Sequence, residues 1–369
     1  MKLTVASSPH IRGDFRSSKL MLDVVIALIP GLIAGAFVLG LRALVVTAVS
    51  MASAVLSEWL YCRVTKKTST LIDCSALVTG MLFALTLPVT TPYYVVVLGS
   101  AFAIVVAKCM CGGLGQNVFN PALLARAFVL LVFPVALTRY QVDGFTGATP
   151  LHHMVMPALP EQSLVDMFLG NCPGSIGEIS ALALVLGGVY LVARKVISPR
   201  IPLAYLGTVA VLTLVFYKAG SPLQWMGYSL LSGGVMLGAI FMATDYATSP
   251  VTAWGQILYG IGCGGLTVLF RYFGLFPEGV TYAILLMNGC VWLLDRYTPP
   301  RRFGTKRGGA GNASVTFAPC RPFGGGGCAA GRLQSAAACA ATGLAAGAER
   351  KNARLAARLG VLPAGGIHR

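Results

Sequence analysis

The sequence predicts an all-α polytopic membrane protein, with about ten transmembrane helices arranged as two inverted five-helix repeats. Three observations predict this fold. Apolar residues make up 56% of the 369 residues and charged residues only 11%, and the mean hydropathy of +0.75 is far from that of a soluble domain. Apolar runs close to the roughly 20 residues that a membrane-spanning helix needs recur along the chain. A short motif also repeats at a constant spacing.

Each half of the chain holds five apolar segments. The first half, residues 20–135, has them at roughly 20–39, 41–61, 72–88, 93–109 and 115–135. The second half, residues 179–304, has them at roughly 179–193, 202–217, 223–244, 254–274 and 278–294. The segment 72–88 is the weakest, because Asp73 interrupts it and Pro88 ends it. Residues 1–19 are polar and lack the pattern of a cleavable signal peptide, so insertion is expected to begin with the first span.

The repeated motif lies in the third span of each half. Residues 80–86, followed by Thr90-Thr91-Pro92, match residues 238–244, followed by Thr248-Ser249-Pro250, at an offset of 158 positions, the difference between positions 80 and 238. Because five spans is an odd number, the second half must be inverted relative to the first. Inverted repeats build sites near the membrane midplane from interrupted helices, and these threonine-rich ends are the expected interruptions. Chance similarity among apolar helices, which use few residue types, is the alternative.

Positive charges indicate the orientation, because lysines and arginines stay on the cytoplasmic side. A cytoplasmic N-terminus leaves only Arg42, Arg139, Lys218 and Arg271 on the other side, with Arg126 inside a span. We therefore expect both termini in the cytoplasm, and the longest loop, residues 136–178, on the extracytoplasmic side. This topology accounts for much of the net charge of +16, and nothing indicates nucleic-acid binding.

A hydroxyl-bearing, glycine-rich motif lies in that loop, at residues 143–150. Read as Asp-Gly-x-[Ser/Thr]-Gly-Ala-Thr, it resembles the acceptor site for covalent flavin. That chemistry needs a hydroxyl that can carry a phosphodiester, here Thr149, and small neighbours that let an enzyme and then a flavin ring approach the backbone. The candidate residues are Asp143, Gly144, Thr146, Gly147, Ala148 and Thr149. An ordinary polar turn ended by Pro150 is the alternative, since Gly, Thr and Asp are common in loops.

A second polar motif, residues 112–122, precedes the fifth span. Asn117 and Asn120 are three residues apart, so they share one face of a helix. Planar amides offer both donors and acceptors, which suits the edge of a flavin ring or of a quinone. Alternatively these residues cap and pack a half-helix, with Asn120-Pro121 as its start. The sequence leaves both interpretations open.

Acids in or near spans are the candidates for an ion pathway, because a charged side chain in the membrane is energetically costly and commonly has a function. They are Asp23, Glu58, Asp73 and Asp245. A solvated helix end or the partner of a nearby base, such as Lys19 for Asp23, is the alternative for each. The sequence shows neither a clustered cysteine ligand pattern nor a dinucleotide-binding fingerprint, so we expect no metal site and no catalysis by this chain alone.

These motifs together resemble one family of membrane redox subunits. The chain is similar to the D subunits of the Rnf complex, an ion-translocating ferredoxin:NAD oxidoreductase, and more distantly to the B subunits of the sodium-pumping NADH:quinone reductase. The resemblance covers about 300 residues, from Ser8-Pro9-His10 to Arg301-Arg302-Phe303-Gly304, and includes residues 85–88, 115–122, 143–151 and Thr244-Asp245-Tyr246.

The resemblance implies a subunit of a six-subunit complex in a prokaryotic cytoplasmic membrane, which couples electron transfer from ferredoxin to NAD to Na⁺ or H⁺ transport. It implies FMN joined through its phosphate to Thr149 by a flavin transferase. It also implies a second, non-covalent flavin, such as riboflavin, at Asn117 and Asn120. A second covalent flavoprotein, iron–sulfur subunits and membrane lipid would be the partners.

Two other functions remain open from the sequence. A passive channel or transporter of urea-channel-like architecture would also use an inverted five-helix repeat, and a structural subunit could have lost its flavin. Residues 305–369 form a low-complexity basic tail that we expect to be disordered or out of frame, because its Gly- and Ala-rich runs cannot make a patterned core. Contact of this tail with anionic lipid is the functional alternative.

Overall fold

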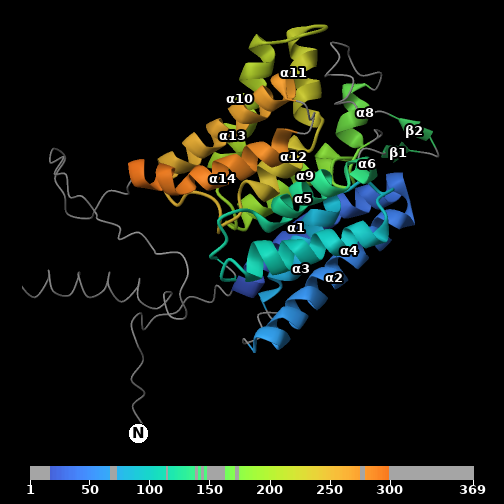
Figure 1. Ribbon diagram of the computed structural model, residues 1–369. Coiled ribbons are helices and arrows are strands. Elements are labelled where there is room, and N and C mark those ends of the chain that lie inside the picture. The colour runs from blue at the N-terminus through green and yellow to red at the C-terminus, as the bar shows by residue number, and fades with distance from the viewer. Residues whose placement is uncertain are drawn as a thin grey trace, which may run out of the picture. The chain divides into compact units, whose positions relative to one another are not determined.

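The computed structural model describes residues 17–66, 73–113, 115–137, 140–142, 145–147, 163–170, 174–274 and 279–298. All of them belong to one unit, Met1–Arg302, and the second unit, Phe303–Arg369, lies outside the described residues together with the predicted tail. The described residues are helical apart from one short hairpin, and Figure 1 shows their order.

The helices follow the expected apolar segments. In the first half these are α1 (Ser17–Leu39), α2 (Leu41–Thr65), α3 (Ser75–Leu85), α4 (Tyr93–Phe102), the π-helical turn η2 (Ala103–Cys109), α5 (Pro121–Val132) and α6 (Pro134–Leu137). The loop region contains β1 (Tyr140–Val142), β2 (Phe145–Gly147) and α8 (Leu164–Leu169). In the second half they are α9 (Ala181–Ala193), α10 (Arg200–Val215), α11 (Pro222–Leu231), α12 (Val235–Leu237), the π-helical turn η3 (Gly238–Met242), α13 (Ala253–Phe273) and α14 (Gly279–Tyr297).

Three described helices, α1, α2 and α13, are long and apolar enough to cross a membrane. The pair formed by α11 and Val235–Met242 would add a fourth, broken span, since its two parts are bent by 64°. Several other apolar helices, among them α3, α5 and α9, are shorter than a span requires. The structure therefore supports a multi-pass membrane protein, and the number of ten spans stays a prediction.

The expected helical fold holds for both halves, and the motif that contains Thr149 is the exception among the described residues. Strands β1 and β2 pair antiparallel there, with Val142 opposite Phe145 and Tyr140 opposite Gly147. In the sequence, Asp-Gly stands between the innermost pair, and this is one of the dipeptides favoured in two-residue hairpin loops. The hairpin was not predicted, since the sequence was interpreted there as a glycine-rich loop. Thr146 and Gly147 belong to β2. Asp143, Gly144, Ala148 and Thr149 lie outside the described residues.

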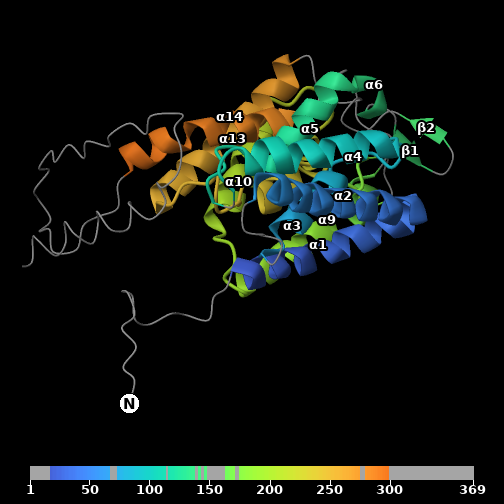
Figure 2. The ribbon, with the colours of Figure 1, turned by 60° about the horizontal axis from the view of Figure 1, so that its bottom comes forward.

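The two halves meet through corresponding helices. Helix α1 packs on α9, and α5 packs on α14, while α2 packs on α3 and α4, and α10 on α13. Figure 2 shows α1 and α9 side by side. Small residues permit the closest of these contacts: a Cβ added at Gly260 of α13 would lie 2.7 Å from the Ala204 Cβ of α10. Helices in membranes commonly approach through such residues.

Two helix breaks lie inside this packing. The first break, residues 86–92, follows the end of α3. The second break, residues 232–234, separates α11 from α12, and Gly233 and Gly234 there have φ values of 66° and 68°. Residues other than glycine rarely adopt this left-handed backbone conformation. The two glycines therefore allow the chain to change direction after α11. The polar groups of the candidate site gather at these breaks and at the start of α5.

Candidate functional site

A cavity of about 570 Å³ opens where the start of α5 meets the segment that follows η3. We call it the main cavity. Its polar lining includes Ser75, Lys108, Asn117, Asn120, Thr244 and Asp245. Pockets for small molecules and cofactors commonly have volumes of about 300–1,000 Å³ and a few placed polar groups in an apolar wall. The structure thus brings both predicted amides and one predicted acid to the same cavity.

Asn120 is the N-cap of α5. Its Oδ1 accepts hydrogen bonds from the backbone N–H groups of Ala122 and Leu123, at 3.0 and 3.4 Å, and its Nδ2 donates to the Met242 carbonyl at 3.1 Å. The capping interpretation of Asn120-Pro121 is confirmed, since Pro121 begins the helix. Asn120 therefore joins α5 of the first half to η3 of the second.

Asn288 and Tyr259, which were not predicted from the sequence, hold Asn120 in place. The Asn288 amide of α14 fits best with its oxygen toward the Asn120 N–H, at 3.2 Å, and its nitrogen toward the Ile284 carbonyl and the Tyr259 hydroxyl, at 3.2 and 2.5 Å. Tyr259 and Asn288 are both buried. An asparagine in an otherwise apolar span was the available signal, because such a residue needs partners there.

Asn117 differs from Asn120 in having unused hydrogen-bonding capacity. It is 8% exposed, and its Oδ1 is buried without a hydrogen-bond partner in the part of the chain that the structure describes. Buried polar atoms are nearly always satisfied, so an orphan acceptor on a cavity wall needs an explanation such as a ligand. Of the two predicted amides, Asn117 is the one whose oxygen has no hydrogen-bond partner in the described part of the chain.

A buried ion pair stands at another part of the same wall. Lys108 Nζ in η2 lies 2.7 Å from Glu58 Oε1 and 2.7 Å from Ser75 Oγ, and the Lys108 and Glu58 side chains are 2% and 1% exposed. The charge count treats Lys108 as one of the cytoplasmic positive charges, and the sequence gives no sign of the pair because Glu58 is 50 residues away. Glu58 as an ion carrier stays a prediction, and the structure shows it engaged with this ammonium group.

The remaining predicted acids lie in different places. Asp245 lines the main cavity and accepts a 3.3 Å hydrogen bond from the Thr248 hydroxyl. Burial raises the pKa of the Asp245 carboxyl, and hydrogen bonds from Ala247, Thr248 and Tyr246 oppose this rise. Asp23 accepts from the Tyr190 hydroxyl at 3.0 Å and lies 3.5 Å from Arg194, a different base from the Lys19 considered above. Asp73 precedes α3 and does not line the main cavity.

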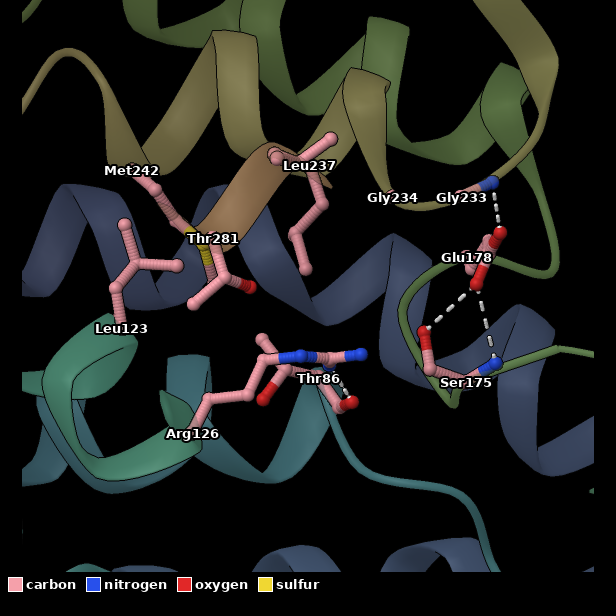
Figure 3. Close-up of a pocket in the computed structure, with 11 residues that line it drawn as sticks. Thr86, Leu123, Arg126, Ser175, Glu178, Gly233, Gly234, Leu237, Met242 and Thr281 are labelled. Atoms are coloured by element: carbon pink, nitrogen blue, oxygen red, sulfur yellow. Dashed lines mark hydrogen bonds between the residues drawn. The ribbon is translucent and has the colours of Figure 1, made fainter. Parts of the chain in front are cut away.

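A second, much smaller cavity of about 20 Å³ lies between the two helix breaks, and we call it the junction cavity. Figure 3 shows Arg126 of α5 on one side and Glu178 on the other. Arg126 donates to the Thr86 carbonyl of the first break, and Glu178 accepts from the Gly233 N–H of the second break. The volume suffices for a single water molecule. Opposite charges therefore engage the backbone of the two breaks on either side of one small polar space.

Residues 174–178, which we call the connecting segment, tie the two breaks together. The Ile176 and Gly177 N–H groups donate to the carbonyls of Leu87 and Leu85, at 3.1 and 2.7 Å. Glu178 completes the link to Gly233 and also accepts from the Ser175 hydroxyl at 3.2 Å. Backbone hydrogen bonds between distant parts of the chain leave no signal in the residue pattern, so the sequence does not reveal this role of Glu178.

Arg271 of α13 holds the second break from the opposite side. Its guanidinium group donates to the carbonyls of Ser229 and Ser232, at 2.6 and 2.7 Å. These are carbonyls near the end of α11, where the helix no longer supplies N–H donors. The sequence analysis placed Arg271 outside the membrane as a topology charge; in the structure it is buried.

Comparison with known proteins adds to this geometry. The family model described as NQR2, RnfD, RnfE matches residues 4–304, which includes every described residue of the two cavities. The chain belongs to the NQR2, RnfD, RnfE family. The match ends at Gly304, where the composition of the chain changes to the low-complexity tail.

Curated relatives from this family are similar over nearly their whole lengths. The chain is 46% identical over 314 residues to the D subunit of the Na⁺-translocating ferredoxin:NAD⁺ oxidoreductase complex of Acetobacterium woodii, covering 83% of this chain and 97% of the relative. It is 42% identical over 324 residues to the D subunit of the proton-translocating ferredoxin:NAD⁺ oxidoreductase complex of Clostridium ljungdahlii, covering 82% and 97%. It is 34% identical over 352 residues to the D subunit of the ion-translocating oxidoreductase complex of Escherichia coli, covering 84% and 100%. Family membership and these names agree with the resemblance seen in the motifs.

Proposed function

We propose that this chain is the flavin-carrying membrane subunit of an ion-translocating ferredoxin:NAD oxidoreductase complex, in which it relays electrons and is not catalytic alone. The observation that carries this proposal is a polar cavity with an unpartnered amide oxygen, built where the start of α5 meets the segment that follows η3, in a chain of this family. Relatives from two organisms are named as the D subunits of such complexes. A second covalent flavoprotein, iron–sulfur subunits and a flavin transferase would be its partners in a six-subunit assembly.

The first cofactor of the proposal is FMN joined through its phosphate to the Thr149 hydroxyl. The motif at 143–150 supports this assignment. Its residues Phe145–Gly147 form strand β2, which pairs with β1. Asp143 and Gly144 have the composition that a two-residue hairpin loop favours. Bound there, FMN would supply a carrier that accepts and releases electrons.

The second cofactor of the proposal is a non-covalent flavin, such as riboflavin, in the main cavity. The residues present fit such a group: the volume is adequate, and the Asn117 Oδ1 offers an acceptor to a ring N–H. Asn120 would act on this flavin by fixing the start of α5, since its own oxygen is already used.

Two inverted five-helix halves and ten spans complete the proposed architecture. Helix α5 begins at Pro121 and α14 at Gly279, two positions separated by the same 158 residues as the repeated motif. In both ribbon views the end of α14 lies on the left and the β1–β2 hairpin on the right (Figures 1 and 2). This supports a Thr149 flavin on the extracytoplasmic side and a main cavity, lined by Ser17 and Asp295, toward the cytoplasmic side of a prokaryotic membrane.

The coupled ion of the proposal is Na⁺ or H⁺, the two ions in the names of the relatives above. Asp245 is the acid whose position best suits a role in ion movement, because it lines the main cavity and its pKa is raised by burial. Asp23, Glu58 and Asp73 are the further candidates from the sequence. Their positions do not join them into one path in the described part of the chain.

Mass spectrometry of the chain, purified from cells that also make the flavin transferase and the other subunits, tests the proposal. We expect a mass increase equal to FMN minus water, lost in Thr149→Ala and kept in Ser163→Ala, a matched hydroxyl in the same loop outside the motif. An unmodified wild-type chain in an assembled complex would contradict the covalent flavin. It would favour a channel or a structural subunit instead.

A further inference from the structure

The hydrogen-bonding capacity left over in the main cavity identifies two side chains that would recognise its occupant. An ammonium group has three N–H donors, and Lys108 uses two of them, on Glu58 and Ser75. Lys108 also lines the main cavity, so its third donor is available to a group in the cavity. Asn117 Oδ1 adds one available acceptor on the same wall. The cavity therefore offers one cationic donor and one neutral acceptor.

This pair of groups suits a particular kind of ring. An imide N–H that stands beside a ring carbonyl satisfies the Asn117 acceptor and presents an acceptor to Lys108. The isoalloxazine ring of a flavin has this arrangement, whereas a quinone has carbonyl oxygens but no N–H. A site built to bond an N–H discriminates strongly against analogues that lack it, because its own buried group is then left unpaired. The leftover capacity thus favours a flavin over a quinone.

Charge gives Lys108 a role beyond recognition. When a flavin takes up two electrons and one proton, it becomes a monoanion, and an anion in a poorly solvated cavity is costly unless a cation is near. Glu58 neutralises Lys108 before reduction, so the resting cavity contains no uncompensated charge from this pair. Asp245 and Asp295 also line the cavity and would oppose a negative ring. Among the residues that line the cavity in the described part of the chain, Lys108 is the positively charged side chain that could offset these two acids.

We propose that Lys108 is the positioning residue that stabilises the negatively charged, reduced form of a flavin in the main cavity, and that Asn117 accepts the ring N–H. The electrons come from the redox partners of the chain and the proton from water, and Lys108 keeps its own three protons throughout. This inference rests on the non-covalent flavin of the proposed function.

The test uses the whole complex, because acid extraction releases non-covalent flavin and leaves covalent flavin on the protein. Replacing Lys108 alone would remove the countercharge of a buried carboxylate, so the informative variant is Lys108→Gln combined with Glu58→Gln, which replaces the ion pair with two amides. Ser53→Ala is the matched control, since it removes a side-chain hydrogen bond from the same helix as Glu58 and does not line the main cavity.

We expect the double variant to retain extractable flavin. In a dithionite titration its flavin should be harder to reduce, with the reduced form bound at least ten-fold more weakly relative to the oxidised form, a shift of about −30 mV for a two-electron couple. Ser53→Ala should keep the wild-type potential, and Asn117→Leu should lose the extractable flavin from an assembled complex.

The outcomes separate the two proposals. An unchanged potential in a double variant that still holds its flavin would overturn the role of Lys108 and leave the flavin site intact. A wild-type complex that releases no flavin would overturn the non-covalent flavin itself, and the inference about Lys108 with it. Retention of flavin in Asn117→Leu would remove Asn117 from the site.

Discussion

Gly177 is the tightest point of the connecting segment, and an added methyl group there should break the link between the two helix breaks. A Cβ at Gly177 would lie 2.8 Å from the Leu85 Cβ and 2.9 Å from the Leu85 carbonyl oxygen. One of these neighbours is backbone, so the overlap cannot be relieved by a rotamer change alone. Gly177→Ala should therefore push the connecting segment away from the end of α3.

The size of the effect follows from the contacts that depend on this approach. Overpacking a buried site costs about 1–3 kcal/mol. Two backbone hydrogen bonds, from Ile176 to Leu87 and from Gly177 to Leu85, would also stretch, and each contributes about 0.5–1.5 kcal/mol. The segment can relieve the overlap only by moving, and this movement weakens the two hydrogen bonds. The free-energy costs of overlap and of lost hydrogen bonds are therefore not fully additive. We expect a net destabilisation of about 2–4 kcal/mol.

Gly174→Ala provides a control in the same segment. The nearest atom to a Cβ at Gly174 is the Glu178 Oε2, at 3.4 Å, which is ordinary van der Waals contact. Such a substitution reduces the entropy of the unfolded chain and should be neutral or stabilising by up to about 1 kcal/mol. Unfolding of the purified chain by a denaturing detergent in mixed micelles, followed by tryptophan fluorescence, measures both variants. Equal midpoints for Gly177→Ala and Gly174→Ala would refute the reasoning.

Three further predictions follow from other contacts. Asn120→Ala removes the cap of α5 and the hydrogen bond to Met242. The same detergent assay should show a loss of unfolding free energy of about 1–3 kcal/mol. A loss below roughly 0.5 kcal/mol, the smallest usual cap effect, would argue against the cap. Arg271→Leu removes a charged donor from the Ser232 carbonyl and should lower stability by about 2–3 kcal/mol, with Arg271→Lys intermediate; full stability of Arg271→Leu would contradict this. Burial raises the pKa of Asp245, so the folded state binds more protons than the unfolded state and stability falls as pH rises through that window. Asp245→Asn should therefore resist unfolding better than the wild type at pH 7 and equally well below pH of about 4, and a difference that grows toward acid would have the wrong sign.

The positions of the helices follow from composition, whereas the contacts at the site do not. Runs of apolar residues mark every helix of the two halves, and Asn120-Pro121 marks the start of α5, because both signals are local. The Lys108–Glu58 pair joins positions 50 residues apart, and the connecting segment bonds through backbone groups that every residue has. Neither interaction has a pattern that a single sequence displays. The proline after Asn120 marks that residue as a cap in the sequence, whereas the unpartnered oxygen of Asn117 is visible only in the structure.

If FMN is joined to Thr149 as proposed, the hairpin also limits how far it can travel. Thr149 follows Gly147, the last paired residue of β2, by two positions, and two residues of extended chain span at most about 7 Å. Strand β1 in turn contacts α1, so the anchor of this tether is part of the helical body. A flavin held on so short a tether cannot swing between distant donors and acceptors as a mobile carrier does. Its redox partners would have to bring their own cofactors to the same spot, which makes the surface around the hairpin a fixed docking point for electron exchange.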